Sequence, residues 1–221
     1  MRATLPIILL SIVLAPAAAG IISTANFDTE AEALAGVVDG FFFVGHGDTE
    51  LVRITRQTPP EVSDIPFNLW NNGQAHAFEL TYDGAGLAAF AIDNVYRITT
   101  GIDVSFFNGL LVTAHADDPN TSVLVSNLVI TDGNLVFYPT AATAFAAGPS
   151  DEDYLRILTD MNLAQKFILS GTATLTWPSA QPRPDLTHLW FEAAPVVIPE
   201  PAPAALLALA WLLVRPARPR R

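Results

Sequence analysis

Residues 167–177 read FILSGTATLTW, and this stretch decides the fold class. Its odd-numbered positions carry Phe, Leu, Gly, Ala, Leu and Trp, whereas its even-numbered positions carry Ile, Ser and three Thr. Successive side chains of a β-strand point to opposite faces of a sheet, so this alternation places the apolar residues on one face. The threonines on the other face suit a strand that is covered on one side only. The stretch therefore predicts a half-buried antiparallel strand.

The same alternation recurs through residues 20–195. The segment 77–84 (AFELTYDG) puts Phe78, Leu80 and Tyr82 on one face before an Asp-Gly turn, and the segment 122–138 reads as strand, turn and strand. Further candidate strands are Leu51–Arg56, Leu87–Ile92, Leu110–Ala114 and His188–Glu192. Short helical turns are expected at 28–36 and at 150–161, and a hairpin turn at Gly45–Glu50. We predict one all-β domain over residues 20–195, an antiparallel β-sandwich that is jelly-roll-like.

Charge and composition narrow the classes of function. The chain has 221 residues and a formal net charge of -11. Residues 20–200 hold all 22 acidic residues but only six of the 11 basic ones. Such a negative surface repels phosphate backbones, so nucleic-acid binding is not expected. The chain contains no cysteine, which excludes disulfides, thiol chemistry and cysteine-based zinc sites.

The first 19 residues have the pattern of a secretory signal peptide. Arg2 supplies a positive start, and Leu5 to Leu14 form an apolar segment that is too short to span a membrane comfortably. Small residues follow, with Ala17 and Ala19 at the positions that signal peptidase reads. We expect export with cleavage after Ala19.

Residues 196–221 have three parts in a fixed order. Pro199, Glu200 and Pro201 come first, Ala202–Val214 is a run of 13 residues without charge, and four arginines follow. At ~1.5 Å per residue, a helical run of this length spans about 20 Å, less than the ~30 Å hydrocarbon core. The arginines favour a cytoplasmic C-terminus. A short apolar helix of this kind predicts a transient membrane association rather than a durable anchor.

This tail resembles the PEP-CTERM sorting signal of exported proteins in Gram-negative bacteria. The resemblance covers about the last 25 residues and rests on the Pro-Glu-Pro motif, the apolar run and the arginine cluster. It implies that an exosortase, a membrane protease, removes the tail. It also implies passage through the inner membrane to the cell surface or the extracellular space, with an association with extracellular polysaccharide.

The middle of the chain is similar to the choice-of-anchor W domain, which occurs on exported bacterial proteins with interchangeable sorting tails. The matching segments are FNLWNNGQAHAFELTYDG (residues 67–84) and DYLRILTDMNLAQKFILSGTATLTW (residues 153–177). The similarity would span most of residues 27–195. Its matching positions are aromatic and turn residues, and the family brings no established chemistry.

Residues that could carry out catalysis or bind metal are scattered. None of His46, His76, His115 and His188 lies within ligand spacing of another, and no HExxH motif occurs. Ser170-Gly171 lacks the first glycine of GxSxG. Residues 117–122 (DDPNTS) offer oxygen ligands for calcium, although a solvated turn is favoured because the EF-hand glycine and terminal glutamate are missing. We therefore expect no catalytic residues, no metal site and no cofactor.

A sugar-binding surface is the main alternative. Trp70 stands beside Asn72 and Gln74, a combination that could stack on a pyranose ring and bond its hydroxyl groups. A core tryptophan followed by an Asn-Gly turn is the favoured interpretation of the same residues. The sequence therefore predicts a non-enzymatic exported protein of the cell surface or matrix. A lectin-like module is the first alternative, and a secreted polysaccharide-active enzyme is the second.

Overall fold

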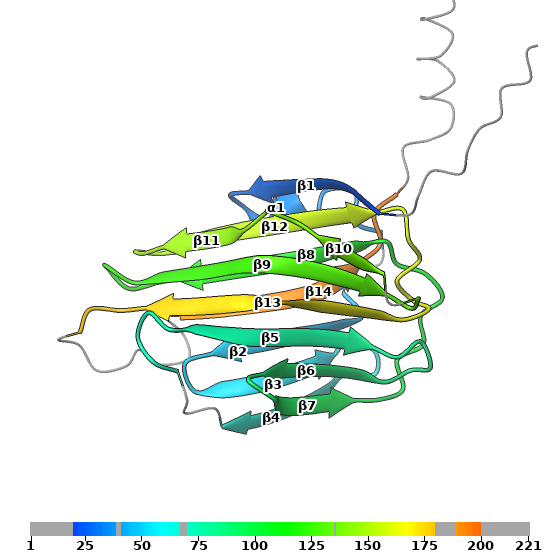
Figure 1. Cartoon of the computed structure of the whole chain (residues 1–221), viewed down its shortest axis with the longest axis horizontal. Helices are drawn as coiled ribbons and strands as arrows, with labels where there is room; N and C mark the ends of the chain where they lie inside the picture. The colour runs from blue at the N-terminus through cyan, green and yellow to red at the C-terminus, as the bar shows by residue number, and fades with distance from the viewer. Residues whose placement is uncertain (1–19, 39–40, 67–69, 135, 180–188, 200–221) are drawn as a thin grey trace, which may run out of the picture.

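The computed structural model describes residues 20–38, 41–66, 70–134, 136–179 and 189–199. Two antiparallel sheets of seven strands each are stacked face to face, which confirms the predicted all-β sandwich. Figure 1 looks onto one sheet, here sheet B, with the other, sheet A, behind it. A single four-residue helix, α1 (Glu30–Ala33), is found among the described residues, capped by the Thr29 hydroxyl, which accepts from the amide of Glu32.

Each sheet joins strands that are distant in the sequence. In order across the sheet, sheet A consists of β1 (Ile21–Phe27), β12 (Asp151–Thr159), β8 (Gly109–Ala116), β14 (Leu189–Val196), β2 (Phe43–Asp48), β3 (Leu51–Arg56) and β4 (Glu61–Pro66). Sheet B consists of β10 (Phe137–Pro139), β9 (Ser122–Asp132), β13 (Phe167–Thr176), β5 (Ala75–Tyr82), β6 (Ala88–Ile92) and β7 (Val95–Thr99), with β11 (Ala144–Ala147) also paired to β9.

Strand β13 has the orientation that its alternation predicts. Phe167, Leu169, Ala173 and Leu175 are buried between the sheets, and the intervening residues lie on the outer face. The strand is central in sheet B because β5 pairs with one of its edges and β9 with the other. In this central position the backbone donors and acceptors of β13 are paired on both sides. The turns predicted after β5 and β9 also form, closed by hydrogen bonds to Asp83 and Asp132.

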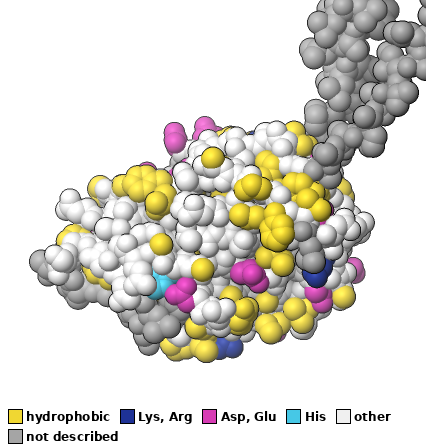
Figure 2. Space-filling view, viewed as in Figure 1, with side chains coloured by type: hydrophobic (Ala, Val, Ile, Leu, Met, Phe, Trp, Pro, Cys, Tyr) yellow, Lys and Arg dark blue, Asp and Glu magenta, His cyan; other side chains and the backbone are white. Residues whose placement is uncertain are grey.

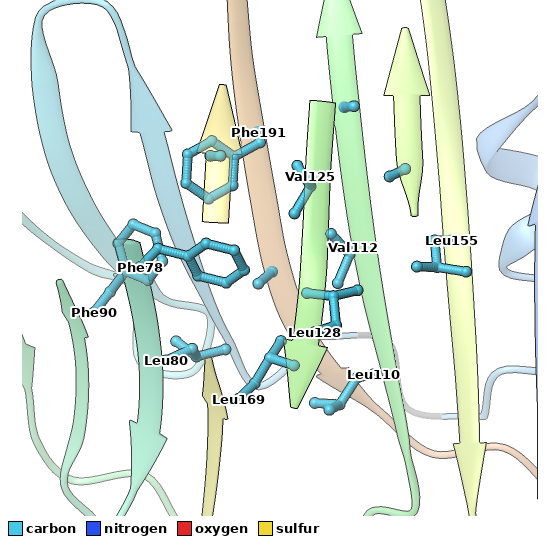
Figure 3. Packing of buried hydrophobic residues seen from close by; sticks show 14 of the residues in the cluster. Phe78, Leu80, Phe90, Leu110, Val112, Val125, Leu128, Leu155, Leu169 and Phe191 are labelled. Carbon is cyan, nitrogen blue, oxygen red and sulfur yellow. The ribbon is translucent and has the colours of Figure 1, made fainter. Parts of the chain in front are cut away.

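The core is a layer of aromatic and aliphatic side chains between the sheets, shown in Figure 3. Phe191 of β14 lies at its centre, with ring centroids 5.1 Å from Phe78 and 6.0 Å from Phe90 of sheet B. These spacings are those of tilted and edge-to-face aromatic pairs, which contribute beyond the area they bury. The two sheets are therefore joined by rings from β14, β5 and β6.

Two expectations from the sequence are wrong. Residues 150–161 do not form a helical turn, because 151–159 is strand β12, paired with both β1 and β8. Residues Gly45–Glu50 are not all turn, because Gly45 to Asp48 belong to β2 and only Thr49 and Glu50 lie between the strands. In the first case the apolar spacing suits a helix, but pairing on both edges outweighs it.

The glycines of β2 serve the packing between sheets rather than a turn. A Cβ atom on Gly45 would lie 2.3 Å from Cδ2 of Phe90, and one on Gly47 would lie 2.5 Å from Cδ1 of Ile92. Strand β2 thus presents bare backbone to the core at two successive inward positions. The rings of Phe90 and Phe191 occupy the space that side chains would otherwise take.

Both ends of the described chain lie at one end of the sandwich. Ile21 at the start of β1 pairs with Thr159, and Val196 at the end of β14 pairs with Gly109, which is itself opposite Leu158. In Figure 1, β1 begins and β14 ends at the same upper right corner. We call this the terminal end of the sandwich.

Substitution of Gly45 by alanine tests this packing. The new methyl group meets a fully buried ring, so the free energy of unfolding should fall by about 1–3 kcal/mol in chemical denaturation. The loss should shrink in a Phe90→Leu background, where the ring is absent. Gly133→Ala is the control, because its Cβ would lie an ordinary 3.4 Å from Cβ of Lys166. Equal losses at both glycines would contradict the role of Gly45.

Candidate functional site

The predicted sorting motif begins directly after Ile198, the last buried residue among those that the structure describes. Ile198 is 9% exposed, and Asn108 holds it by two hydrogen bonds. The Asn108 amide donates to the Ile198 carbonyl at 2.8 Å, and its oxygen accepts from the Ile198 amide at 2.8 Å. Pro199 is exposed, while Glu200 and Pro201 lie outside the described residues. Packing thus continues three residues beyond the expected boundary at 195.

The other terminus is held in a similar way. The Gly20 amide donates to Oδ1 of Asp160 at 2.5 Å, and the Asp160 amide donates to the Gly20 carbonyl at 3.2 Å. Ala17 and Ala19 lie outside the described residues, so their part in cleavage stays a prediction. Cleavage after Ala19 would turn the Gly20 nitrogen into an ammonium group beside the Asp160 carboxylate. None of the described helices is long and apolar enough to cross a membrane.

The candidate sugar-contact residues Trp70, Asn72 and Gln74 make contacts within the domain that support its fold. Trp70 is 4% exposed, and its ring packs edge-on against His76 with centroids 4.5 Å apart. Asn72 bonds the backbone of Trp177 twice, donating to its carbonyl and accepting from its amide. Gln74 accepts from the side chain of Asn71 at 2.8 Å. The Trp70 ring therefore has no open face on which a sugar could stack.

A different surface is open to a ligand. A groove of about 510 Å³ crosses β13, β5, β6 and β7 on the outer face of sheet B, the face seen in Figure 2. Ala77, Ala91 and Gly171 line its floor, and the small side chains of Ala77 and Ala91 leave the space open. Tyr96, which is 50% exposed, contributes an aromatic ring.

The polar lining of the groove comes from adjacent strands. Ser170 of β13 and Glu79 of β5 are direct cross-strand partners. Asn127 has a φ of 55° at a β-bulge, where two residues of β9 stand opposite Gly171, and its amide donates to the Thr172 hydroxyl at 3.1 Å. The groove thus combines hydroxyl, amide and carboxylate groups with one exposed ring.

Asp93 at the edge of this groove is engaged by its neighbours. Its Oδ1 accepts from the amide of Ala77 at 3.0 Å, and its Oδ2 lies 2.5 Å from Nδ1 of the buried His76. Asp93 and Asn94 both have positive φ in the two-residue turn between β6 and β7. Asp93 therefore orders the hairpin and His76 together.

The outer face of sheet A carries a second polar cluster, which we call the histidine–carboxylate patch: His46, Asp48, His115, Glu152, Trp190 and Glu192. Register brings it together, because Glu152, His115, Trp190 and Asp48 are successive partners across β12, β8, β14 and β2. The Trp190 ring stacks on His115, with centroids 4.7 Å apart and planes 13° from parallel. Sequence spacing could not have revealed this cluster, since its members come from four distant segments.

His46 is the charged centre of this patch. Its Nε2 lies 2.8 Å from Asp48 and its Nδ1 lies 3.1 Å from Glu192, so each ring nitrogen faces a carboxylate. Burial lowers the pKa of His46, but the hydrogen bonds and charges of Asp48 and Glu192 outweigh it and raise the pKa from 6.5 to about 8. Because both nitrogens are engaged, the imidazolium stabilises the sheet surface and presents neither nitrogen as a base.

The remaining candidates take part in local structure. Each described histidine bonds to a carboxylate, with His115 2.9 Å from Glu152, while His188 lies outside the described residues. In the 117–122 loop the Thr121 amide and hydroxyl both donate to the Asp118 carbonyl, and Asn120 has a φ of 62°. Within the described parts of the chain, no group of three or more His, Asp or Glu residues is arranged to hold a metal ion.

Comparison with known proteins does not assign the chain to a family. No family model matches the chain, and no curated protein is similar to it. The resemblances of the tail and of the middle region therefore stay predictions.

The raised pKa of His46 gives a testable pH dependence. Since the folded value of about 8 exceeds the unfolded value of 6.5, this histidine stabilises the fold fully below pH 6.5. That contribution, about 2 kcal/mol, is lost as the pH rises through 8. In an NMR titration one histidine should titrate near pH 8, and its signal should be missing in His46→Gln. Glu192→Gln should lower that pKa, and an unchanged pKa would contradict the assignment.

Proposed function

We propose that this chain is an exported, non-enzymatic β-sandwich protein that is sorted through its C-terminal tail to the cell surface or the extracellular matrix. Signal peptidase would remove residues 1–19, and an exosortase-type protease would act at Pro199, Glu200 and Pro201. The short apolar helix of the tail would hold the protein at the inner membrane between these two steps. After β7 the chain crosses repeatedly between the sheets, with β8 in sheet A, β9 to β11 in sheet B, β12 in sheet A, β13 in sheet B and β14 in sheet A, which supports a jelly-roll-like connectivity.

The observation that carries the proposal is the position of the motif relative to the fold. Asn108 holds Ile198, the last buried residue among those described, and the exposed Pro199 is the next residue. Proline cannot donate a backbone hydrogen bond and keeps the residue before it extended. A protease needs an extended segment outside the packed domain, and the exposed position of Pro199, the first residue of the motif, supports such a role.

Separate substitutions in the tail test the proposal. Converting Pro199, Glu200 and Pro201 to alanine should leave membrane insertion intact and block cleavage, so that full-length protein accumulates in the membrane fraction. Replacing the four terminal arginines by glutamate should instead weaken retention during export. Immunoblots of fractionated cells and mass spectrometry of the mature protein measure both effects.

A reporter fusion supplies the control. Residues 196–221 fused to an unrelated secreted protein should be removed in a host that has an exosortase, and retained in a host that lacks one. A tail that persists in both hosts would overturn the sorting proposal. The apolar run would then be better interpreted as a weak permanent anchor.

Glycan binding in the sheet B groove is a second candidate function. The exposed Tyr96 ring beside hydroxyl, amide and carboxylate groups is the observation that favours it. The carboxylate of Glu79 would repel anionic sugars, so the expected ligand is a neutral polysaccharide. A polysaccharide-active enzyme is less well supported, since Asp93 already accepts hydrogen bonds from His76 and Ala77.

Affinity electrophoresis in gels containing dextran or galactomannan tests this second function. Tyr96→Ala should abolish the retardation of the wild-type protein, because a stacking ring contributes about 1–2 kcal/mol, equivalent to about a tenfold loss of affinity. Phe145→Ala is the matched control, since it removes an equally exposed ring outside the groove. Equal retardation of both variants and the wild type would exclude the groove as the site.

A further inference from the structure

The terminal end of the sandwich is built from a cluster of connections that touch one another. The segment 160–166 crosses from β12 to β13, and the Leu163 amide donates to the Phe107 carbonyl at 2.8 Å. A Cβ on Gly84 would overlap the Gln165 carbonyl, so the turn after β5 lies directly against this segment. The Ile102 amide donates to the Gly86 carbonyl at 3.1 Å, which adds the loop after β7. Gly20 and Ile198 are held at this same end.

This end also carries most of the exposed apolar side chains. Within the described residues ten large hydrophobic side chains are exposed, and six lie in β1, at the start of β10 or in connections at the terminal end. We call these six the terminal apolar surface: Ile22, Val38, Leu87, Phe106, Val136 and Phe137. Phe137 is 70% exposed and Val38 is 63% exposed. In Figure 2 hydrophobic side chains gather on the right-hand part of the face, toward this end.

Asp83 and Asp132 lie in turns at the terminal end, but their carboxylates do not cover the exposed apolar side chains. Asp83 accepts hydrogen bonds from the amides of Ala85 and Leu87. Asp132 accepts from the amides of Asn134 and Val136. Their carboxylates are therefore drawn back onto the turns, while the apolar side chains of Leu87 and Val136 stay exposed.

The chain length beyond Ile198 sets how far this end can stand from the membrane. Ala202, where the apolar run begins, is four residues after Ile198. At ~3.3–3.6 Å per residue, an extended chain of that length reaches about 14 Å at most. A tail in the bilayer would therefore hold the terminal end, and no other part of the domain, against the lipid surface.

We propose that the terminal apolar surface contacts the lipid surface of the membrane while the tail is inserted. The partner is a lipid bilayer of low charge, because the acidic domain would be repelled by an anionic one. The contact fixes the orientation of the domain and keeps Pro199 at the interface, where a membrane protease could reach it. This inference rests on the proposed function, because the inserted tail brings the two surfaces together.

Site-specific labels can test the contact, because the chain has no cysteine of its own. Phe137→Cys and Phe145→Cys are each labelled with an environment-sensitive fluorophore in the full chain, which is then reconstituted into phosphatidylcholine vesicles that contain a nitroxide-labelled lipid. Phe145 is 50% exposed but pairs with Leu124, near the other end of β9. The label at 137 should shift to the blue and lose emission, whereas the label at 145 should do neither.

Vesicle flotation distinguishes a failure of the lipid contact from a failure of tail insertion. A chain that floats with the vesicles, but whose label at 137 behaves like the label at 145, overturns the lipid contact and leaves the sorting proposal standing. A chain that does not float overturns tail insertion and the contact together. As a second variant, Phe137→Ser should reduce quenching of a label at Val136→Cys, and Phe145→Ser should not. Both residues are exposed, so neither substitution should lower the melting temperature appreciably.

Discussion

The structure depends on the close approach of β2 to sheet B, which two glycines make possible. Any side chain at Gly45 or Gly47 would occupy the space of Phe90, Ile92 or Phe191. These side chains are fully buried, and the ring of Phe191 joins β14 of sheet A to Phe78 of β5 and Phe90 of β6 in sheet B. Sheets that pack face to face are about 10 Å apart, and the bare backbone at Gly45 and Gly47 leaves room between them for the rings of Phe90 and Phe191. The packing of the aromatic core therefore requires glycine at positions 45 and 47 of β2.

This rigid core has consequences for the termini. Strand β14 supplies Phe191 to the core and leads directly into Ile198, which Asn108 clamps at the terminal end. Gly20 is held at the same end by Asp160. The segments predicted to direct export thus adjoin a well-packed surface rather than a long linker. For the same reason the orientation of the domain at a membrane would be set by its own apolar residues.

Much of the fold was predictable because strand alternation is a local property. The faces of β13 and β5 followed from period-two patterning alone, and the turns after β5 and β9 followed from their Asp-Gly pairs. Strand β12 was missed because the apolar spacing of residues 150–161 also fits a helix, and only pairing with β1 and β8 decides between the two. The groove was missed because it depends on Ala77, Ala91 and Gly171 being neighbours across three strands.

By itself the sequence determined the fold class, the absence of thiol chemistry and the acidic character of the domain, because these depend on composition and on short-range periodicity. It also carried the export and sorting predictions, since such signals are recognised as linear segments. Only the tertiary structure decided that Trp70 is buried, that Tyr96 stands over an open groove, and that His46 lies between two carboxylates. Those outcomes depend on which strands become neighbours and in what register, and register is set by the packing of the whole sandwich.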